Sequence, residues 1–251
     1  SEDLTGQSGG TYTVTLSDGN GCTISSTFVI AEPSALSVAD QITDVVCFGA
    51  LNGGIDLTVS GGTLPFTYAW DTGATSEDLA GLSGGTYTVT ITDANACTTV
   101  QTYFVFEPTQ LMVSFTQVDV SCNGLTDGSI DVSVLGGTVP YTYDWNSGTY
   151  TTEDLSGLAA GTYNLVVTDA NSCTAIATVT IIEPSALGLG GIVVDVSCNG
   201  IQDGSIDVSA SGGTLPYAYA WNTGATSEDL TGQSGGTYTV TLSDGNGCTI
   251  S

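Results

Sequence analysis

The sequence predicts an all-β protein built from tandem β-sandwich domains in a linear array. Three observations support this prediction: apolar and polar residues alternate along short stretches, turn sequences separate these stretches, and one unit repeats every 75 to 76 residues. Alternation with a period of two is typical of half-buried strands, and many short strands at regular turn spacings indicate a sandwich.

The repeated unit is plain in the sequence itself. One half reads CFGALNGGIDLTVSGGTLPFTYAWDTG from Cys47, CNGLTDGSIDVSVLGGTVPYTYDWNSG from Cys122 and CNGIQDGSIDVSASGGTLPYAYAWNTG from Cys198. A second half follows each time and contains Gly-Thr-Tyr and then Asp-Ala-Asn-x-Cys or Asp-Gly-Asn-x-Cys. Self-similarity of this kind predicts one small domain for each copy of the unit.

A Glu-Pro pair closes the units at Pro33, Pro108 and Pro184, where the fixed φ angle of proline suits a short, stiff junction. We therefore expect four segments along the chain. They are the C-terminal part of a repeat at 1–33, whole repeats at 34–108 and 109–184, and a repeat lacking its last strand at 185–251.

The two ends of the chain carry the same sequence. Residues 1–25 are identical to residues 227–251, whereas neighbouring units differ at many positions. We therefore expect a super-repeat of three units within a much longer array.

The central strand of the second unit shows the alternation that predicts the fold. In GSIDVSV, Ile130, Val132 and Val134 share one face, and Asp131 and Ser133 share the other. Gly-Gly-Thr-x-Pro and Asp-x-Asn sequences supply the turns between such strands.

Each unit has one tryptophan, which by its size should dominate a small core. The stretch LAGLSGGTY, which ends at Tyr87, resembles the tyrosine corner of immunoglobulin-like and fibronectin type III domains. We therefore predict that each unit is an Ig-like (fibronectin III/PKD-like) β-sandwich. The predicted core residues are Trp70, Trp145, Trp221, Tyr87, Tyr163 and Tyr238.

The charge of the chain excludes several functions. It has 26 Asp and Glu residues and no Lys, Arg or His, so it cannot neutralise a phosphate backbone, and nucleic acid is not an expected partner. Catalysis by Ser-His-Asp, by Cys-His or by a lysine Schiff base is excluded for the same reason. A glycosidase-like pair such as Glu153 and Asp154 remains as an alternative, but a sandwich of this size offers little room for a cleft, so we expect no enzyme. No apolar run approaches the length of a membrane span, and no membrane insertion is expected.

The seven cysteines place two in each whole unit. We expect disulfides within domains, in the pairs Cys47 with Cys97, Cys122 with Cys173, and Cys198 with Cys248. Cys22 then pairs outside the segment. The alternatives are a bond between Cys97 and Cys122 across a junction, buried free thiols, or a metal site. Paired cysteines in a small acidic domain indicate an oxidising, extracellular location.

The expected cysteine pairing constrains the number of strands in each sandwich. A cysteine after the first strand and one in the last hairpin must then lie at one end of the sandwich, which in simple up-and-down order requires an even number of strands. A straight head-to-tail array prefers an odd number, so the strand count stays open.

Acidic residues recur in register in loops rich in Asp, Asn and Gly, which offer the oxygen ligands that calcium prefers. Their spacing does not match an EF-hand or the nonapeptide calcium repeat, and solvated acidic turns explain them equally well. No cofactor is therefore expected apart from a calcium alternative. Its weak candidates are Asp127, Asp131, Asp203 and Asp207.

The motifs Cys-Asn-Gly, Asp-Gly-Ser-Ile, Gly-Gly-Thr-x-Pro-Tyr, Gly-Thr-Tyr and Asp-Ala-Asn-x-Cys together resemble the SprB repeat family of large cell-surface adhesins of gliding Bacteroidota. The resemblance covers all three units. It implies type IX secretion, display at the cell surface as a long filament, adhesion or gliding motility, and no catalytic residues. The first unit departs from the pattern at Phe48 and at Asn52, so any role of an aspartate at position 52 is lost there.

The leading hypothesis is a structural stalk or sticky filament of a secreted surface adhesin. Its expected partners are extracellular surfaces or polysaccharide, the neighbouring repeats of the chain, and other copies in a filament. The alternative is an extracellular module that binds calcium or a glycan. Because alternation places most aromatic residues inward, Tyr150 is the best exposed candidate for glycan contact.

Overall fold

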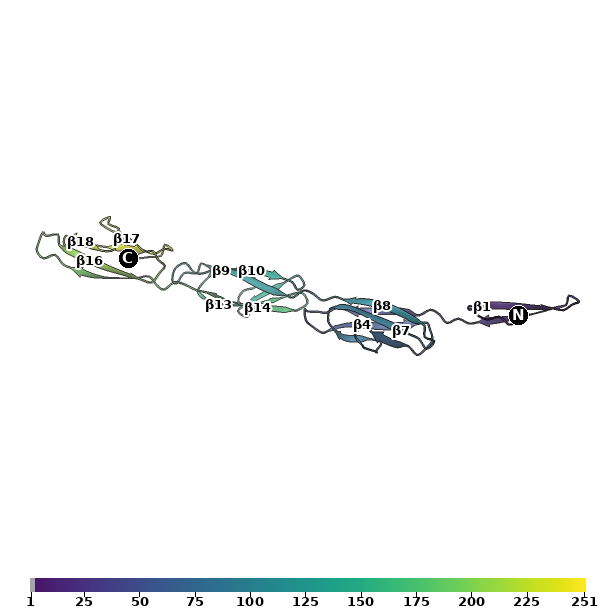
Figure 1. The fold of residues 1–251 in the computed structure, drawn as a ribbon. Helices are drawn as coiled ribbons and strands as arrows, with labels where there is room; N and C mark the ends of the chain where they lie inside the picture. The colour runs from purple at the N-terminus through teal and green to yellow at the C-terminus, as the bar shows by residue number, and fades with distance from the viewer. Residues whose placement is uncertain (1–2) are drawn as a thin grey trace. The chain divides into compact units, whose positions relative to one another are not determined.

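The computed structural model describes residues 3–251, and this part of the chain consists of strands, turns and loops without a helix (Figure 1). The strands form small antiparallel sheets, which confirms the predicted all-β, Ig-like class. The chain divides into two compact units, Ser1–Thr109 and Gln110–Ser251.

The first unit contains a β-hairpin and one β-sandwich. The hairpin pairs β1 (Gly10–Ser17) with β2 (Thr23–Ile30). In the sandwich, the sheet β3-β4-β6 and the sheet β5-β7-β8 share one apolar core. The strands of the sandwich are β3 (Ser37–Thr43), β4 (Gly53–Ser60), β5 (Thr67–Trp70), β6 (Leu79–Leu82), β7 (Gly85–Thr92) and β8 (Thr98–Val105).

The second unit contains two sandwiches of the same design. The strands of the first are β9 (Met112–Val118), β10 (Gly128–Leu135), β11 (Thr142–Trp145), β12 (Leu155–Leu158), β13 (Gly161–Thr168) and β14 (Thr174–Ile181). Those of the second are β15 (Gly188–Val194), β16 (Gly204–Ser211), β17 (Ala218–Trp221), β18 (Leu230–Gln233), β19 (Val240–Ser243) and β20 (Thr249–Ile250). We call the sandwiches β3–β8, β9–β14 and β15–β20 the first, second and third repeats.

The strand directions in the second repeat show how the chain passes through a sandwich. β9 and β12 both pair antiparallel with β10, and β11 and β14 both pair antiparallel with β13. The C-terminal ends of β9 and β14 lie together, because the Gln117 side chain donates a hydrogen bond to the Thr180 carbonyl at 2.9 Å. The first and last strands therefore run in the same direction, although there are six strands.

The crossover from β11 to β12 resolves the question of strand number. These two strands lie in different sheets and run in the same direction, so the up-and-down order is broken once between them. An even number of strands then still carries the chain from one end of the sandwich to the other. We call the end where the first strand begins the leading end, and the end where the last strand finishes the trailing end.

The core of the second repeat is the most complete. Trp145 is fully buried, and its Nε1–H donates to the Thr152 carbonyl at 3.0 Å. Tyr163 is also buried, and its hydroxyl donates to the Ala159 carbonyl at 3.0 Å, as in a tyrosine corner. Trp70, Trp221 and Tyr87 are buried at the matching positions, and the half-buried Tyr238 packs against the core of the third repeat.

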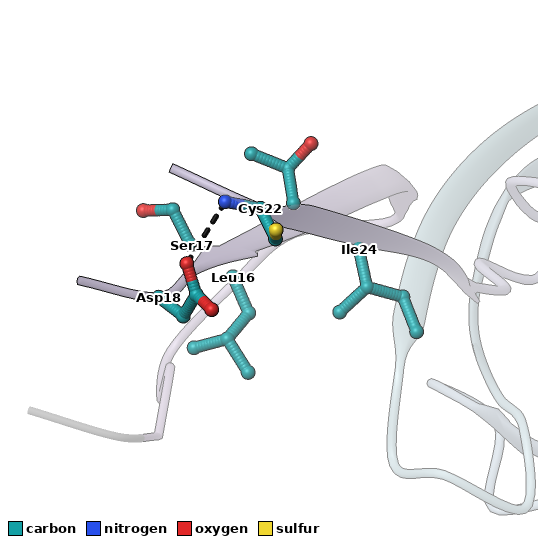
Figure 2. Close-up of a pocket in the computed structure, with 6 residues that line it drawn as sticks. Leu16, Ser17, Asp18, Cys22 and Ile24 are labelled. Carbon is teal, nitrogen blue, oxygen red and sulfur yellow. Dashed lines mark hydrogen bonds between the residues drawn. The ribbon is translucent and has the colours of Figure 1, made fainter. Parts of the chain in front are cut away.

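The hairpin β1–β2 corresponds to β7–β8 of the first repeat but has no second sheet over its apolar face in the described part of the chain. Val14 and Leu16 are 56% and 68% exposed, whereas Val89 and Ile91 at the matching positions are fully buried. Figure 2 shows Leu16 and Ile24 projecting from the hairpin near Cys22. The comparison shows how much of each repeat core depends on the facing sheet.

Candidate functional site: the cysteine junction

Each repeat has a last hairpin whose turn carries an aspartate and, four residues later, a cysteine. In the third repeat, Asp244 Oδ1 accepts hydrogen bonds from the backbone N–H groups of Asn246 at 3.0 Å and Cys248 at 2.9 Å. Asp244 Oδ2 accepts one from the N–H of Thr214 at 2.8 Å, in the loop that joins β16 to β17. The carboxylate therefore holds the hairpin cysteine in a fixed place at the leading end.

The same arrangement recurs at Asp93 and Asp169. In the isolated hairpin, Asp18 accepts only the bonds of its own turn, from the N–H groups of Asn20 at 2.8 Å and Cys22 at 2.9 Å (Figure 2). The turn motif therefore forms locally, and the facing sheet adds the third bond.

These bonds change the acidity of the hairpin aspartates. Burial by itself would raise the pKa of Asp244, but the N–H groups of Thr214, Cys248, Asn246 and Gly247 stabilise the carboxylate more strongly, so its pKa is lowered. The pKa of Asp93 is lowered for the same reason, against the effect of its burial. Both residues act as anionic acceptors that fix the hairpin.

A second cysteine follows the first strand of each repeat, in what we call the first loop. In the second repeat, the N–H of Ser121 donates to Asp127 Oδ1 at 3.0 Å, and the Ser121 hydroxyl donates to Asp127 Oδ2. The Ser121 hydroxyl and N–H lower the pKa of Asp127. In the third repeat, Ser197 and Asp203 repeat this pairing, with an N–H bond of 3.0 Å and a lowered pKa of Asp203.

The first repeat keeps this bond despite its sequence change. Asn52 Oδ1 accepts a hydrogen bond from the N–H of Val46 at 3.1 Å. An amide oxygen thus serves as the acceptor where the other repeats have a carboxylate.

The first loop also closes over the trailing end of its own repeat. The N–H of Val120 donates to the Ile182 carbonyl at 3.0 Å, and the N–H of Ile182 donates to Asp119 Oδ1 at 3.0 Å. The Asn123 side chain donates to the Pro184 carbonyl at 3.1 Å. These bonds fix the first-loop cysteine beside the Glu-Pro pair that leads into the next repeat.

The cysteines of consecutive repeats meet at this point. Cys122 of the second repeat forms a disulfide with Cys248 of the third, with 5.7 Å between their Cα atoms. The Asn246 side chain donates to the Ser121 carbonyl at 2.8 Å beside the disulfide. A covalent bond and a hydrogen bond therefore join the trailing end of one repeat to the leading end of the next.

This arrangement corrects the predicted pairing within domains. Cys122 bonds to Cys248 and not to Cys173, while Cys97 and Cys198 are exposed free thiols, so the three predicted pairs are wrong. Cys47 and Cys173 are disulfide-bonded as well, and Cys22 is a free thiol.

The physical reason is the direction of the strands. The first-loop cysteine lies at the trailing end, and the hairpin cysteine lies before the last strand, at the leading end. An eight-residue strand separates them by about 25 Å, far beyond the 7 Å or so between Cα atoms that a disulfide can span.

The weak calcium candidates do not come together. Asp127 and Asp203 hold their first loops, and Asp131 and Asp207 lie at exposed positions of β10 and β16. Among residues 3–251, no group of three or more acidic or cysteine side chains is arranged to hold a metal ion.

The Glu-Asp pairs named as an enzymatic alternative have structural contacts. Asp154 Oδ1 accepts a hydrogen bond from the N–H of Val132 in β10 at 2.9 Å. Burial, and then a hydrogen bond to Glu153, raise the pKa of Tyr143 to about 12. The two carboxylates thus join the loop before β12 to both sheets.

The glutamate of the Glu-Pro pair has a role that sequence reasoning missed. Glu183 Oε2 accepts a hydrogen bond from the N–H of Gly124 in the first loop at 2.6 Å, and Glu107 accepts one from Gly49 in the first repeat. A glutamate precedes the proline at every unit end in the sequence, and this recurrence could have indicated a role for the glutamate side chain.

The SprB repeat family model matches the chain three times, at residues 39–75, 114–150 and 190–226.

Solved structures give low similarity. The C-terminal 282-residue fragment of intimin, in complex with the intimin-binding domain of its translocated receptor, is 14% identical, with 63% of this chain and 67% of that chain covered and a TM-score of 0.35. The eight N-terminal Ig domains of Down syndrome cell adhesion molecule are 9% identical, with 96% and 50% covered and a TM-score of 0.30. This chain thus spans half the length of the latter. The curated proteins gave no match.

The fold and the junction define a class of protein, namely tandem Ig-like sandwiches in which a disulfide joins the second repeat to the third. Within that class, the three matches show that the chain carries SprB repeats, and it is therefore a repeat module of a surface adhesin.

Proposed function

We propose that this chain is a structural and adhesive segment of a long extracellular bacterial filament, which is exported by type IX secretion and supports surface attachment and gliding. One observation carries the structural part: the second and third repeats are joined in series by the Cys122–Cys248 disulfide. A bond at this place resists separation of the repeats when the chain is under tension.

The charge of the chain supports a place outside the cell. With 26 acidic residues and no basic ones, neighbouring segments repel each other, which favours solubility and an extended array. The absence of Lys and Arg also removes every trypsin cleavage site. The disulfides fit an oxidising location. In residues 3–251 there is no helix that could cross a membrane.

A single-molecule pulling experiment tests the structural part. The chain is held by its two ends and stretched in oxidising and then in reducing buffer. The disulfide shortens the chain that can be stretched, because it links residues that are 126 positions apart. Cys173, which lies between them, and Cys47 are disulfide-bonded as well, so reduction breaks these bonds too and should lengthen the fully stretched chain. No gain in length on reduction would contradict the structural proposal.

Bead retention under flow tests the adhesive part. Beads that carry the chain are compared, on glass and on polysaccharide-coated surfaces, with beads that carry an unrelated acidic β-sandwich of similar charge. Greater retention of the SprB-repeat beads is expected. Equal retention on every surface would refute adhesion and leave a spacer role.

Glycan binding is a second candidate because Tyr150, which extends from the loop after β11, is 39% exposed. Glycan-array binding by the chain that is lost in Tyr150→Ala would support it. Binding that survives this change would place the glycan contact elsewhere.

A further inference from the structure

The cysteines of this chain fall into two kinds by their place in the repeat. First-loop cysteines lie at a trailing end, and hairpin cysteines lie at a leading end. The Cys122–Cys248 disulfide joins one of each kind. One first-loop cysteine, Cys198, is a free thiol, and so are two hairpin cysteines, Cys97 and Cys22; all three are exposed.

The loop around Cys198 is built like the loop around Cys122. Ser197 precedes it as Ser121 precedes Cys122, and the N–H of Ser197 donates to Asp203 at 3.0 Å, the same distance as at Asp127. The first loop of the third repeat therefore repeats the Ser–Asp pairing found beside the bonded Cys122.

The hairpin around Cys97 matches the hairpin around Cys248. The N–H of Cys97 donates to Asp93 Oδ1 at 2.8 Å, and the Asn95 side chain donates to Thr63 Oγ1 at 2.9 Å. Asn246 makes the corresponding bond to its own threonine and, in addition, bonds the partner loop at Ser121. Asn95 is thus in place for a partner loop.

A hollow lies beside Cys97 at the leading end of the first repeat. It has a volume of about 240 Å³ and is lined by Asp93, Cys97 and Gly62 together with residues 32–36 of the linker. At the leading end of the third repeat, the corresponding hairpin is covered by Ser121 and Cys122 of the preceding repeat. The hollow is therefore the place where a first loop would dock.

The repeated ends of the sequence select Cys97 over Cys22 as the partner. Because residues 1–25 are identical to 227–251, Cys22 corresponds to Cys248, whose partner is a first loop of the Cys122 kind. The repeat that follows residues 1–25 along the chain contains Cys97. The unit that contains residues 1–25 corresponds to the unit that contains Cys198, and the next unit along the chain contains Cys97. In the expected super-repeat, the first loop that matches Cys198 is therefore followed by the hairpin that matches Cys97.

We propose that Cys198 and Cys97 are the two halves of a further disulfide, which joins the third repeat of one copy of this chain to the first repeat of a second copy. This inference rests on the serial arrangement in the proposed function and names its covalent partner. Two thiols and one low-molecular-weight disulfide, such as oxidised glutathione, yield one protein disulfide and two small thiols. One protein thiolate attacks the small disulfide, and the second then displaces the remaining small thiol from the mixed disulfide.

The experiment uses the full chain at micromolar concentration with oxidised glutathione. Non-reducing electrophoresis should show a ladder of multimers, and peptide mass spectrometry should find Cys198 linked to Cys97. Cys198→Ser and Cys97→Ser should each abolish the ladder. Cys22→Ser is the matched control, because it removes an exposed hairpin thiol that corresponds to Cys248 and not to Cys97, and it should leave the ladder intact.

Several results would overturn the inference. They are the absence of multimers, predominance of Cys198–Cys198 or Cys97–Cys97 links, or loss of the ladder in Cys22→Ser. Detection of the Cys122–Cys248 peptide in every variant shows that the junction has folded. A missing ladder with this peptide present refutes only the Cys198–Cys97 assignment, whereas absence of this peptide from the native chain refutes the serial proposal itself.

Discussion

Replacing Cys248 by serine should destabilise the third repeat selectively. When that repeat unfolds with the disulfide intact, its chain remains tied at two points to the folded second repeat. One is the peptide linkage after Pro184, which the Asn123 side chain holds, and the other is Cys122. The disulfide therefore closes a loop of roughly 64 residues, which corresponds to about 4 kcal/mol in the chain-entropy model.

This magnitude is large relative to the stability of the repeat. A domain of this size has a free energy of unfolding of about 3 to 10 kcal/mol. The third repeat has a small core, whose buried apolar side chains are Val208, Trp221, Leu230 and Leu242. Losing about 4 kcal/mol should lower the protection of its amides by up to a thousand-fold, or unfold the repeat outright.

Hydrogen exchange with peptide-resolved mass spectrometry measures this effect. Protection should fall in β16, β18 and β19, change much less in β13 and β14, and stay the same in β4 and β7. Cys122→Ser should give the same pattern, because it removes the same bond from the other side. Cys97→Ser is the matched control, since it changes an unbonded hairpin cysteine. Unchanged protection of the third repeat in Cys248→Ser, or an equal loss in all repeats, would refute the reasoning.

Three further predictions concern the contacts inside the repeats. The folded pKa of Asp93 lies below its ordinary value of 3.8, so its stabilising effect is complete above about pH 4 and is lost as the pH falls through the lower folded value. Asp93→Asn should therefore lower the urea midpoint of the first repeat at pH 7 and weaken its dependence on acid. Asp18→Asn should change this midpoint little, and equal effects of the two variants would count against the cross-sheet bond. Burial, and then a hydrogen bond of 2.8 Å to Glu228, raise the pKa of Tyr219 to about 12, so a late phase in the ultraviolet titration of tyrosine should shrink in Glu228→Gln; an unchanged titration would exclude the pair as its cause. Trp145→Ala should cost the second repeat about 3 to 5 kcal/mol in calorimetry because the side chain is fully buried, and a loss below about 1 kcal/mol would show that the core can collapse around the gap.

The sequence by itself determined the features that depend on local pattern. Alternation in GSIDVSV places Ile130 and Val132 in the core, and both are buried in β10. The single tryptophan of each unit lies in its core for the same reason, since a large apolar side chain on the inner face has no other place to go. The Asp-x-Asn-x-Cys turn is likewise local, as its formation in the isolated hairpin at Asp18 shows.

Only the tertiary structure decided how the cysteines pair. The sequence spacing brings two cysteines into every repeat, but the crossover between β11 and β12 sends them to opposite ends of the sandwich. Strand direction after a crossover depends on how two sheets pack, and no alternation of residues records it. The tertiary structure also decided the role of Asp127, which was a candidate calcium ligand from the sequence. The course of the first loop brings Ser121 to Asp127, and the Asp127 carboxylate accepts a hydrogen bond that fixes this loop. The disulfide between repeats is therefore a property of the assembled chain, whereas the strands that present its cysteines are a property of each unit.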